Sequence, residues 1–350
     1  MAQTSRQVVT RALTFEFPAR LPRDLWILPW AEIHYARELK ELKQRFPSDF
    51  TRPDYSYPPS PRQKGEPNRC GEYTDEWGCV FVNIQDGVQG EVKEPLVADI
   101  SEWKKVQPPY EQLPENPGKM YAAVSRFYEN TDRFVLANSC ARPWERYQFL
   151  RGTENALMDV MFPQQGFGKL LKVIHDFYLK EIELWAKAQV DGIFFMDDWG
   201  TQNQLLIRPE LWREYFKPLY RDYCDLAKAY NKFVFMHSDG YIFDIYDDLI
   251  EVGVDAINSQ LFCMDIEEIG RRFKGRITFW GEIDRQHVLP SKDPQVGRMA
   301  VRKLAEHLCD PAGGMIAQFE FGPGANPATA FAVAEEWQRV ERELNERNKV

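Results

Sequence analysis

Short apolar segments that end in polar residues recur through the second half of this chain, and they constrain its fold more than any other feature. Lys232–Met236 runs directly into His-Ser-Asp-Gly. Four further segments behave in the same way: Asp191–Gly200, Val254–Gln260, Arg276–Asp284 and Gly314–Gly322. Each is rich in aromatic or β-branched residues, which is typical of buried strands. Helical patterns separate them, so the sequence predicts parallel strands joined by helices.

The first half of the chain supplies weaker strand signals. Arg23–Trp30, Asp49–Tyr57 and Arg133–Ser139 bring the predicted parallel strands to eight. Residues 70–92 alternate and turn like a β-hairpin. The predicted fold is therefore α/β, a (β/α)8 TIM barrel with an N-terminal extension and a β-hairpin insertion. We expect one domain over residues 1–350.

Composition excludes several classes of function. The net charge is -9 and the basic residues are scattered, so the chain lacks an electrostatic footprint for nucleic acid. No segment approaches the roughly 18 apolar residues of a membrane span, and no apolar signal region follows the start. The six cysteines show no CxxC or other paired metal spacing. We therefore expect a soluble, reduced, cytoplasmic protein.

The polar strand ends predict a site at one rim, because catalytic groups of this fold sit at the C-terminal ends of strands. Side chains two residues apart share one face of a strand. The pairs expected to share a face are His237 with Asp239, Asn258 with Gln260, Glu282 with Asp284, and Gln318 with Glu320. If these faces point inward, the cluster suits metal binding or acid–base chemistry. The alternative is that His237 only hydrogen-bonds a neighbouring loop.

Asp197 and Asp198 follow an apolar strand as adjacent carboxylates. Two close acids in a site of low dielectric raise the pKa of one of them, which suits a proton donor. Because adjacent strand residues face opposite sides, only one is expected in the pocket. Parity with Phe195 favours Asp197, which leaves Asp198 to brace a loop or cap a helix.

Three further features have both a functional and a structural interpretation. His34 and Trp199 lie close to predicted strand ends, where they would contact a substrate, although a helix-surface His and a core Trp are the alternatives. The segment Asp75-Glu76-Trp77-Gly78 in the hairpin is similar to Asp-Asp-Trp-Gly at 197–200. Packing and function remain equally open for it.

Together these motifs resemble the uroporphyrinogen decarboxylase superfamily, which also contains cobalamin-dependent methyltransferases. The resemblance runs from about residue 25 to residue 337. It is carried by TDEWGCVF at Thr74, RPWERYQFLRGTENALMDV at Arg142, DGIFFMDDWGTQ at Asp191, MHSDGYIFDIYDDLIEVGVDAIN at Met236, FWGEID at Phe279 and FEFGPG at Phe319. The implied fold is a (β/α)8 barrel, in agreement with the strand count.

The chain departs from the porphyrin decarboxylases of this superfamily. Their arginine-bearing RQAGRY motif is replaced by residues 28–37, LPWAEIHYAR, and their late Gly-His-Gly by Gly322-Pro-Gly324. Without those arginines a tetrapyrrole bearing many carboxylates lacks counter-charges. The resemblance therefore favours the methyltransferase branch.

That branch uses zinc, often held by His-x-Cys on this strand and by a late Cys. Here His237 matches, Asp239 replaces the Cys, and the late position is Ala325 or Asn326. The resemblance thus implies a zinc site with harder ligands, completed by Glu282 or Glu320. Loss of sulfur favours an oxygen-bound substrate.

We therefore predict a methyltransferase-like enzyme that demethylates a small methoxylated or methylated substrate and passes the methyl group to a corrinoid (cobalamin) protein. The predicted catalytic residues are Asp197, His237, Asp239, Glu282 and Glu320; the substrate contacts are His34, Trp199, Asn258, Gln260 and Gln318; the zinc ligands are His237, Asp239 and Glu282. Two alternatives stay open: a metal-free decarboxylase or other lyase acting on a small carboxylic acid, with Asp197 handling the proton, and a non-catalytic ligand-binding barrel. Since superfamily members often dimerise, a homodimer is a further expectation.

Overall fold

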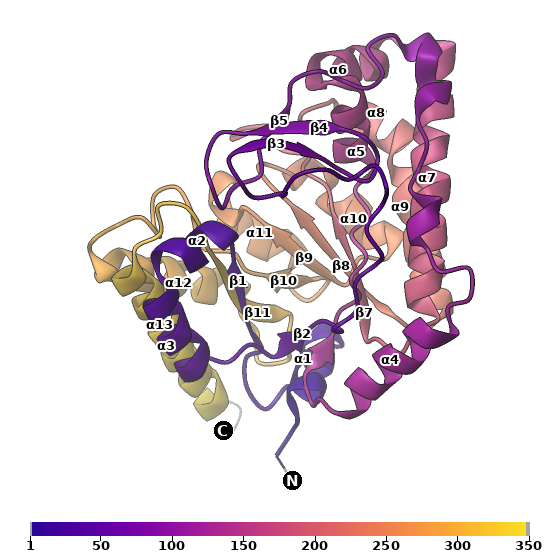
Figure 1. The fold of residues 1–350 in the computed structure, drawn as a ribbon. Helices are drawn as coiled ribbons and strands as arrows, with labels where there is room; N and C mark the ends of the chain where they lie inside the picture. Colours follow the sequence, from indigo (N-terminus) through magenta and orange to yellow (C-terminus); the bar gives the residue numbers. More distant parts are fainter. Residues whose placement is uncertain (1, 348–350) are drawn as a thin grey trace.

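The computed structural model describes residues 2–347 and has a curled, all-parallel sheet at its centre (Figure 1). The six strands of this sheet follow the order β1-β11-β10-β9-β8-β7. A short parallel pair, β2 with β6, accompanies them, and an antiparallel sheet, β3-β4-β5, lies apart. The strands are β1 Arg23–Ile27, β2 Phe50–Thr51, β3 Gly71–Thr74, β4 Val80–Asn83, β5 Glu91–Val92, β6 Phe134–Val135, β7 Gly192–Met196, β8 Phe233–Ser238, β9 Ala256–Ser259, β10 Thr278–Trp280 and β11 Met315–Phe321.

The six-strand sheet and the β2–β6 pair are separate ladders in the described residues, and isolated backbone contacts join them on both sides. Parallel bridges join Leu136 to Gly192 and Ala141 to Phe195, which connects the β6 region to β7. On the other side, the Asp49 N–H donates to the Arg23 carbonyl at 2.8 Å, which connects β2 to β1. The α/β, TIM-barrel-like prediction is confirmed. The expected closed barrel is instead a six-strand half-barrel extended by a short two-strand pair.

Helices surround the sheet and connect its strands. The α-helices are α1 Ser5–Leu13, α2 Pro29–His34, α3 Ala36–Arg45, α4 Gly118–Glu129, α5 Pro143–Arg151, α6 Thr153–Met161, α7 Gln165–Ala186, α8 Pro209–Tyr215, α9 Lys217–Ala229, α10 Tyr246–Val252, α11 Ile266–Phe273, α12 Pro294–Leu308 and α13 Pro327–Arg347. Short 3-10 helices span Ile100–Lys105, Tyr110–Gln112, Phe243–Ile245 and Leu261–Cys263. None of the helices in residues 2–347 has both the length and the apolar character needed to cross a membrane.

Proline explains one departure from the predicted helices. The sequence pattern favours one helix over residues 209–230, but α8 ends at Tyr215 and α9 begins at Lys217. Pro218 lacks an N–H group and its ring clashes with the preceding turn, so the chain restarts a helix there. The predicted helices at residues 266–273 and 294–308 match α11 and α12.

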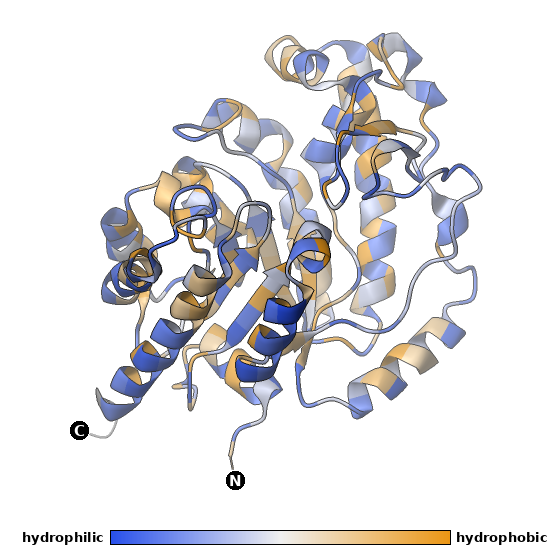
Figure 2. Cartoon of the chain, turned by 60° about the vertical axis from the view of Figure 1, so that its left-hand side comes forward, coloured by the Kyte–Doolittle hydropathy of each residue, from blue (hydrophilic) through white to orange (hydrophobic). Residues whose placement is uncertain are grey.

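Two buried layers lie on opposite faces of the curled sheet. Outside it, helices that mix hydrophilic and hydrophobic residues pack on the strands (Figure 2). Inside it, a separate aromatic cluster fills the centre: Phe50, Phe134, Phe194, Phe235 and Trp280. The Trp280 ring lies 5.0 Å from that of Phe235 and 5.8 Å from that of Phe50. Because this cluster fills the sheet interior, polar side chains that point inward meet only near the strand ends.

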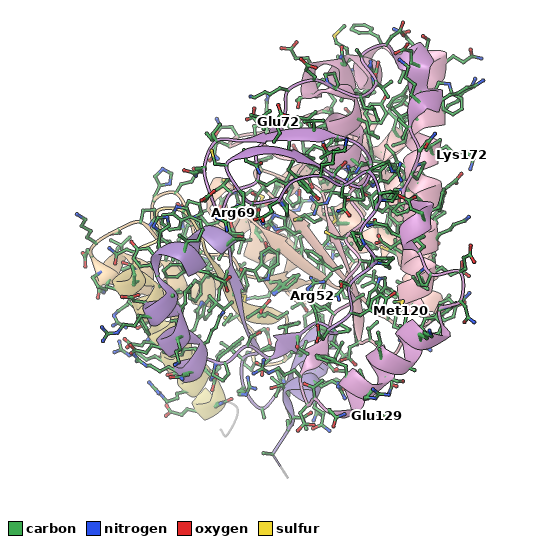
Figure 3. All side chains as sticks on the ribbon, viewed as in Figure 1. Arg52, Arg69, Glu72, Met120, Glu129 and Lys172 are labelled. Atoms are coloured by element: carbon green, nitrogen blue, oxygen red, sulfur yellow. The ribbon has the colours of Figure 1, made fainter. Side chains whose placement is uncertain are left out.

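The predicted hairpin insertion is present and lies over the carboxyl ends of the central strands (Figure 1). Tyr73 pairs with Phe81 in the antiparallel register of β3 and β4. Figure 3 labels Arg69 and Glu72 on this segment. At the turn, the Asp75 carboxylate accepts the Trp77 N–H at 3.0 Å and the Cys79 N–H at 2.8 Å. This aspartate therefore shapes the hairpin tip.

Candidate active site

Alternation along the strands decides which polar side chains meet at the mouth. Phe194 and Phe235 belong to the interior cluster, whereas Phe195 packs in the outer layer. Counting in steps of two from interior residues gives the inward positions: Asp198 from Phe194, His237 and Asp239 from Phe235, Asn258 from Ala256, Glu282 from Trp280, and Gln318 and Glu320 from Ile316. The prediction that Asp197 faces inward is therefore wrong. It counted in steps of two from Phe195, which packs in the outer layer, whereas Phe194 is the residue that faces inward.

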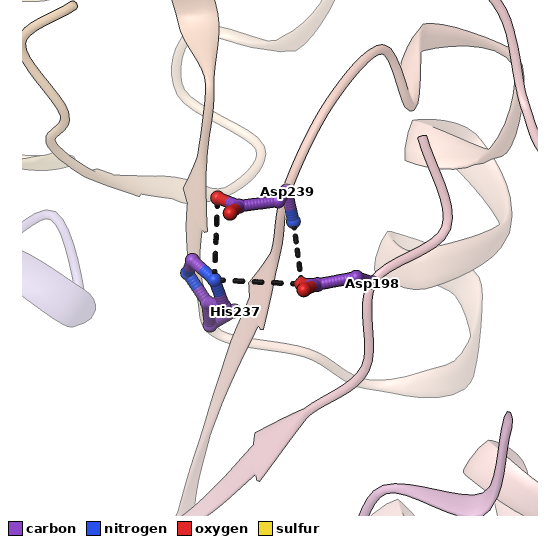
Figure 4. Close-up of side chains that lie close together, drawn as sticks. All are labelled: Asp198, His237 and Asp239. Atoms are coloured by element: carbon purple, nitrogen blue, oxygen red, sulfur yellow. Dashed lines mark hydrogen bonds and ion pairs between the residues drawn. The ribbon is translucent and has the colours of Figure 1, made fainter. Parts of the chain in front are cut away.

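Asp198, His237 and Asp239 form a compact cluster at the ends of β7 and β8 (Figure 4). The His237 Nε2 atom lies 3.5 Å from Asp198 Oδ1 and 3.4 Å from Asp239 Oδ1. The Asp239 N–H donates to Asp198 Oδ1 at 2.9 Å. Among residues 2–347, no other three His, Cys, Asp or Glu side chains bring their ligand atoms within 4.8 Å of one another.

Asn258 fixes the orientation of the His237 ring. Its Oδ1 lies 2.6 Å from His237 Nδ1, and its Nδ2 donates to Gln318 Oε1 at 3.0 Å and to the Trp280 carbonyl. Because the Asn258 amide donates on the other side, its oxygen accepts a proton carried by Nδ1. The other ring nitrogen, Nε2, then faces the two aspartates. Burial opposes the charged ring, but Asp239 and Asp198 raise the pKa of His237 above its ordinary value.

Arg285 gathers three carboxylates beside this cluster. Its guanidinium lies 2.8 Å from Glu320 Oε1 and 3.2 Å from Glu282 Oε1, and it also donates to Asp239 Oδ1. Burial opposes ionisation of Asp239, but His237 and Arg285 lower its pKa. In contrast, burial raises the pKa of Glu282 well above its usual range, and Glu282 Oε2 has no hydrogen-bond partner in the described residues.

Glu282 does not belong to the metal-ligand group in which the sequence analysis included it. The group consists of His237, Asp239 and Asp198, while Glu282 contacts Arg285 instead. Sequence reasoning missed both Asp198 and Arg285 as site residues. A usable signal for Arg285 was present, since three carboxylates predicted at one rim require a cation nearby.

Asp197 is fully buried and braces helix α5. Its carboxylate accepts the N–H groups of Trp144 and Glu145 at 2.8 and 2.7 Å and the Tyr220 hydroxyl at 2.6 Å. These contacts satisfy free N–H groups in the first turn of α5. Burial raises the pKa of Asp197 to about 7. Its carboxylate is thus directed at a helix end, away from the interior face that holds Asp198.

The five predicted substrate contacts separate into three groups. His34 is exposed at the end of α2, and its ring centre lies 4.3 Å from that of Trp30. Trp199 is fully buried, and its Nε1 donates to Tyr220 Oη at 2.8 Å. Asn258 and Gln318 are fully buried and support His237 from behind. Only Gln260 lines a cavity next to the cluster.

That cavity has a volume of about 330 Å³ and opens beside the ends of β8 and β11. Its polar lining includes Asp239, Gln260, Arg285 and Glu320, and its apolar lining includes Leu289. Asp239 is therefore the member of the cluster that adjoins open space. A small substrate in this cavity would meet a carboxylate held by both His237 and Arg285.

The donor set of the cluster fits a zinc ion. Tetrahedral zinc with bonds of about 2.0–2.2 Å to nitrogen and oxygen places neighbouring ligand atoms roughly 3.3–3.6 Å apart. The Nε2–Oδ1 distances of 3.5 and 3.4 Å match this spacing. The hydrogen bond between His237 Nδ1 and Asn258 is the kind of outer contact that orients a zinc-binding imidazole.

A family model described as uroporphyrinogen decarboxylase (URO-D) matches residues 75–339. No curated protein matches the chain.

Among solved structures, a methyltransferase from Methanosarcina mazei is similar with a TM-score of 0.67 and 12% identity, over 96% of this chain and 99% of that one. A xylanase from Gloeophyllum trabeum (TM-score 0.39, 13% identity, 66% and 81% covered) and a GH113 β-1,4-mannanase (TM-score 0.39, 12% identity, 92% and 99% covered) are far more distant. At these identities the methyltransferase likeness establishes the fold.

Proposed function

We propose, from the premise that this chain belongs to the uroporphyrinogen decarboxylase family, that it is a methyltransferase-like enzyme. In this proposal the enzyme demethylates a small methoxylated or methylated substrate and passes the methyl group to a corrinoid protein. The convergence of His237, Asp198 and Asp239 at the sheet mouth carries the proposal. The methyltransferase from Methanosarcina mazei, which has the same fold, adds support.

Zinc is the metal we propose for this site, held by His237, Asp198 and Asp239. When bound, it would supply Lewis acidity to an oxygen of the substrate. Asn258 keeps His237 Nε2 directed at the two carboxylates, and Arg285 holds Asp239 in place. With oxygen and nitrogen donors in place of thiolates, the site suits a methoxyl oxygen better than a thiol.

Glu282 is the group we propose as proton donor. When an oxygen–methyl bond breaks and the methyl group leaves for the acceptor, the oxygen that remains gains a proton. Burial raises the pKa of Glu282 well above its usual range, so its carboxyl group keeps a proton to higher pH than an ordinary glutamate does. It lines a small cavity of about 50 Å³ together with Gln260 and Arg285, both of which also line the larger cavity.

Porphyrin decarboxylation is disfavoured by the charge around the larger cavity. Its one arginine, Arg285, already binds Asp239, Glu282 and Glu320. A tetrapyrrole with several carboxylates would therefore meet acidic side chains without a free counter-charge there. The corrinoid partner, a homodimer, a single domain over residues 1–350 and a cytoplasmic location remain predictions.

Metal analysis and a methyl-transfer assay test the proposed function. We expect about one zinc per chain in the wild type, loss of zinc in His237→Ala and Asp198→Asn, and retention in His34→Ala, whose imidazole is exposed and outside the cluster. Transfer from a panel of methoxylated compounds to added cob(I)alamin is followed by absorbance. A zinc-free protein that decarboxylates a small acid would support the lyase alternative. Ligand binding without turnover would support a non-catalytic barrel.

A further inference from the structure

A second cavity lies beneath the hairpin insertion, on the β6 side of the mouth. Its volume is about 400 Å³, and the β3–β4 hairpin, helix α5 and helix α7 contribute to its wall. The segments that the sequence singled out at residues 74–81 and from Arg142 onward meet here, although the proposed chemistry uses neither. They are held together by Arg146, which pairs with Asp75 and with Glu76 Oε1 at 3.3 Å.

Aromatic side chains make up much of the cavity wall. They include Tyr57, Tyr73, Trp77, Phe149, Phe177 and Tyr178. The Trp77 and Phe177 rings lie 5.1 Å apart in an edge-to-face arrangement, which fixes both. Rigid aromatic rings in the wall favour a flat ligand body, and the polar side chains between them can bind its polar groups.

Arg142 is a charged group in this wall with few partners. Its hydrogen bond in the described residues goes from Nη2 to the Cys140 sulfur at 3.3 Å, and its nearest ion-pair oxygen is Glu145 Oε2 at 3.9 Å. A guanidinium offers five N–H donors, and a thiol is a weak acceptor. Arg146 has two carboxylates for the same five donors. Arg142 thus keeps unused donors in a cavity that can hold an anion.

The carboxyl groups in and beside this cavity leave Arg142 without a close ion pair, since the oxygen of its nearest ion pair, Glu145 Oε2, lies 3.9 Å away. Burial raises the pKa of Glu145 to about 8, so Glu145 is mostly protonated at pH 7. Burial also raises the pKa of Glu181 to about 7. Glu76 and Asp75 are already paired with Arg146. Arg142 therefore has no carboxylate within hydrogen-bonding distance in the described residues, whereas Arg146 pairs with two.

We propose that this cavity binds a flat, singly charged carboxylate and that Arg142 anchors its anionic group. This deepens the proposed function, on which it rests, by naming an aromatic methoxy acid as the class of methyl-bearing substrate. Arg142 is connected to the metal cluster through neighbouring residues. Arg142 immediately precedes α5, Asp197 accepts two N–H groups from the first turn of that helix, and the next residue is Asp198.

Binding of 4-methoxybenzoate, measured by titration calorimetry, tests this assignment without turnover. The neutral probe is 4-methoxybenzamide, and the cationic probe is 4-methoxybenzylammonium. We expect the wild type to bind the carboxylate at least about tenfold more tightly than either, because hydrogen bonds to charged groups are the strong ones. Arg142→Gln should lose about tenfold or more of that affinity, and Arg142→Lys should lose less.

Arg23→Gln is the matched control. Its side chain is 20% exposed, against 19% for Arg142, but it pairs with Glu341 at the start of β1, away from the strand ends that form the mouth. This variant should bind the carboxylate as the wild type does. Circular dichroism confirms that each variant is folded before titration.

The outcomes separate this proposal from the proposed function. Equal binding of the amide and the carboxylate, or unchanged affinity in Arg142→Gln, would overturn the role of Arg142. Tighter binding of the ammonium probe would overturn it as well and would assign the cavity to its acidic side chains. Selective carboxylate binding without methyl transfer would support the binding site and contradict the proposed function. Methyl transfer from neutral methoxylated compounds that is unaffected by Arg142→Gln would support the proposed function and contradict the role of Arg142.

Discussion

Arg285 and Arg142 lie at the same mouth but have opposite charge environments. Arg285 contacts three carboxylates, Asp239, Glu282 and Glu320, whereas Arg142 has a thiol and one distant, mostly protonated carboxyl group. An arginine whose donors are satisfied by the protein stabilises the fold around it. An arginine with unused donors beside a cavity is available to a ligand. Two residues of the same type are thus distinguished by their partners: Arg285 is a structural cation, and Arg142 is a candidate binding cation.

The largest expected effect is the loss of stability in Arg285→Ala. Removing this guanidinium leaves three carboxylates without their cation, and breaking a buried ion pair from one side costs about 3–5 kcal/mol. Urea unfolding at pH 7 measures the change. Arg271→Ala is the control, because Arg271 is 68% exposed and pairs only with Glu268, so that its loss should cost about 1 kcal/mol or less. Equal losses in the two variants would contradict the structural role of Arg285.

The second largest expected effect is a pH dependence of stability that arises from Glu181, which lines the same cavity as Arg142. The pKa of Glu181 rises from 4.5 to about 7 on folding, mainly through burial. The folded protein therefore holds a proton that the unfolded chain releases, and the contribution of Glu181 to stability falls as pH rises from about 4.5 to 7. Its full size is about 3 kcal/mol, at about 1.4 kcal/mol per pKa unit.

Glu181→Gln should remove this dependence. The free energy of unfolding of the variant, relative to the wild type, should increase between pH 5 and pH 8. Urea titrations at both pH values provide the comparison. A constant difference between variant and wild type would show that the wild-type carboxyl group does not change protonation on folding in this range.

A smaller effect is expected where one side chain only orients another. Asn258→Ala removes the acceptor at His237 Nδ1 without removing a candidate ligand. Loss of such an outer contact typically lowers metal affinity about 10- to 100-fold. Competition with a chelating dye measures zinc affinity directly. Gln318→Ala, one step further from the ring, should have a weaker effect, and the reverse order would contradict the chain His237–Asn258–Gln318.

Sequence patterns were informative where the deciding interactions are local. The strands ending at His237 and Asn258 follow from apolar runs, and the proximity of His237 to Asp239 follows from two-residue alternation. The choice between Asp197 and Asp198 failed because Phe194 and Phe195 are both buried, one inside the sheet and one beneath the helices. Hydrophobicity cannot distinguish two buried faces; the strand's position in the curled sheet decides between them.

The roles of the two arginines were harder to predict: the clustered carboxylates indicated that a cation was needed at the rim, but not which residue supplies it. Arg285 lies in a loop three residues after Glu282, and its other two partners, Asp239 and Glu320, are brought to it only by the complete sheet. The unused donors of Arg142 depend on an absence, namely that no carboxylate lies within hydrogen-bonding distance of it in the described residues. Neither property has a periodic signal in the chain.

The smallest expected effect on stability is also the most direct test of the difference between Arg142 and Arg285. Arg142→Gln should change the free energy of unfolding by less than about 1 kcal/mol, because the variant loses one thiol contact and one ion pair that is 3.9 Å long. Urea unfolding without ligand measures this change. With saturating 4-methoxybenzoate the wild type should gain stability by mass action, and the variant should gain less. If Arg142→Gln instead destabilised the free protein as strongly as Arg285→Ala, both arginines would be structural, and the difference in their partners would not predict a difference in role.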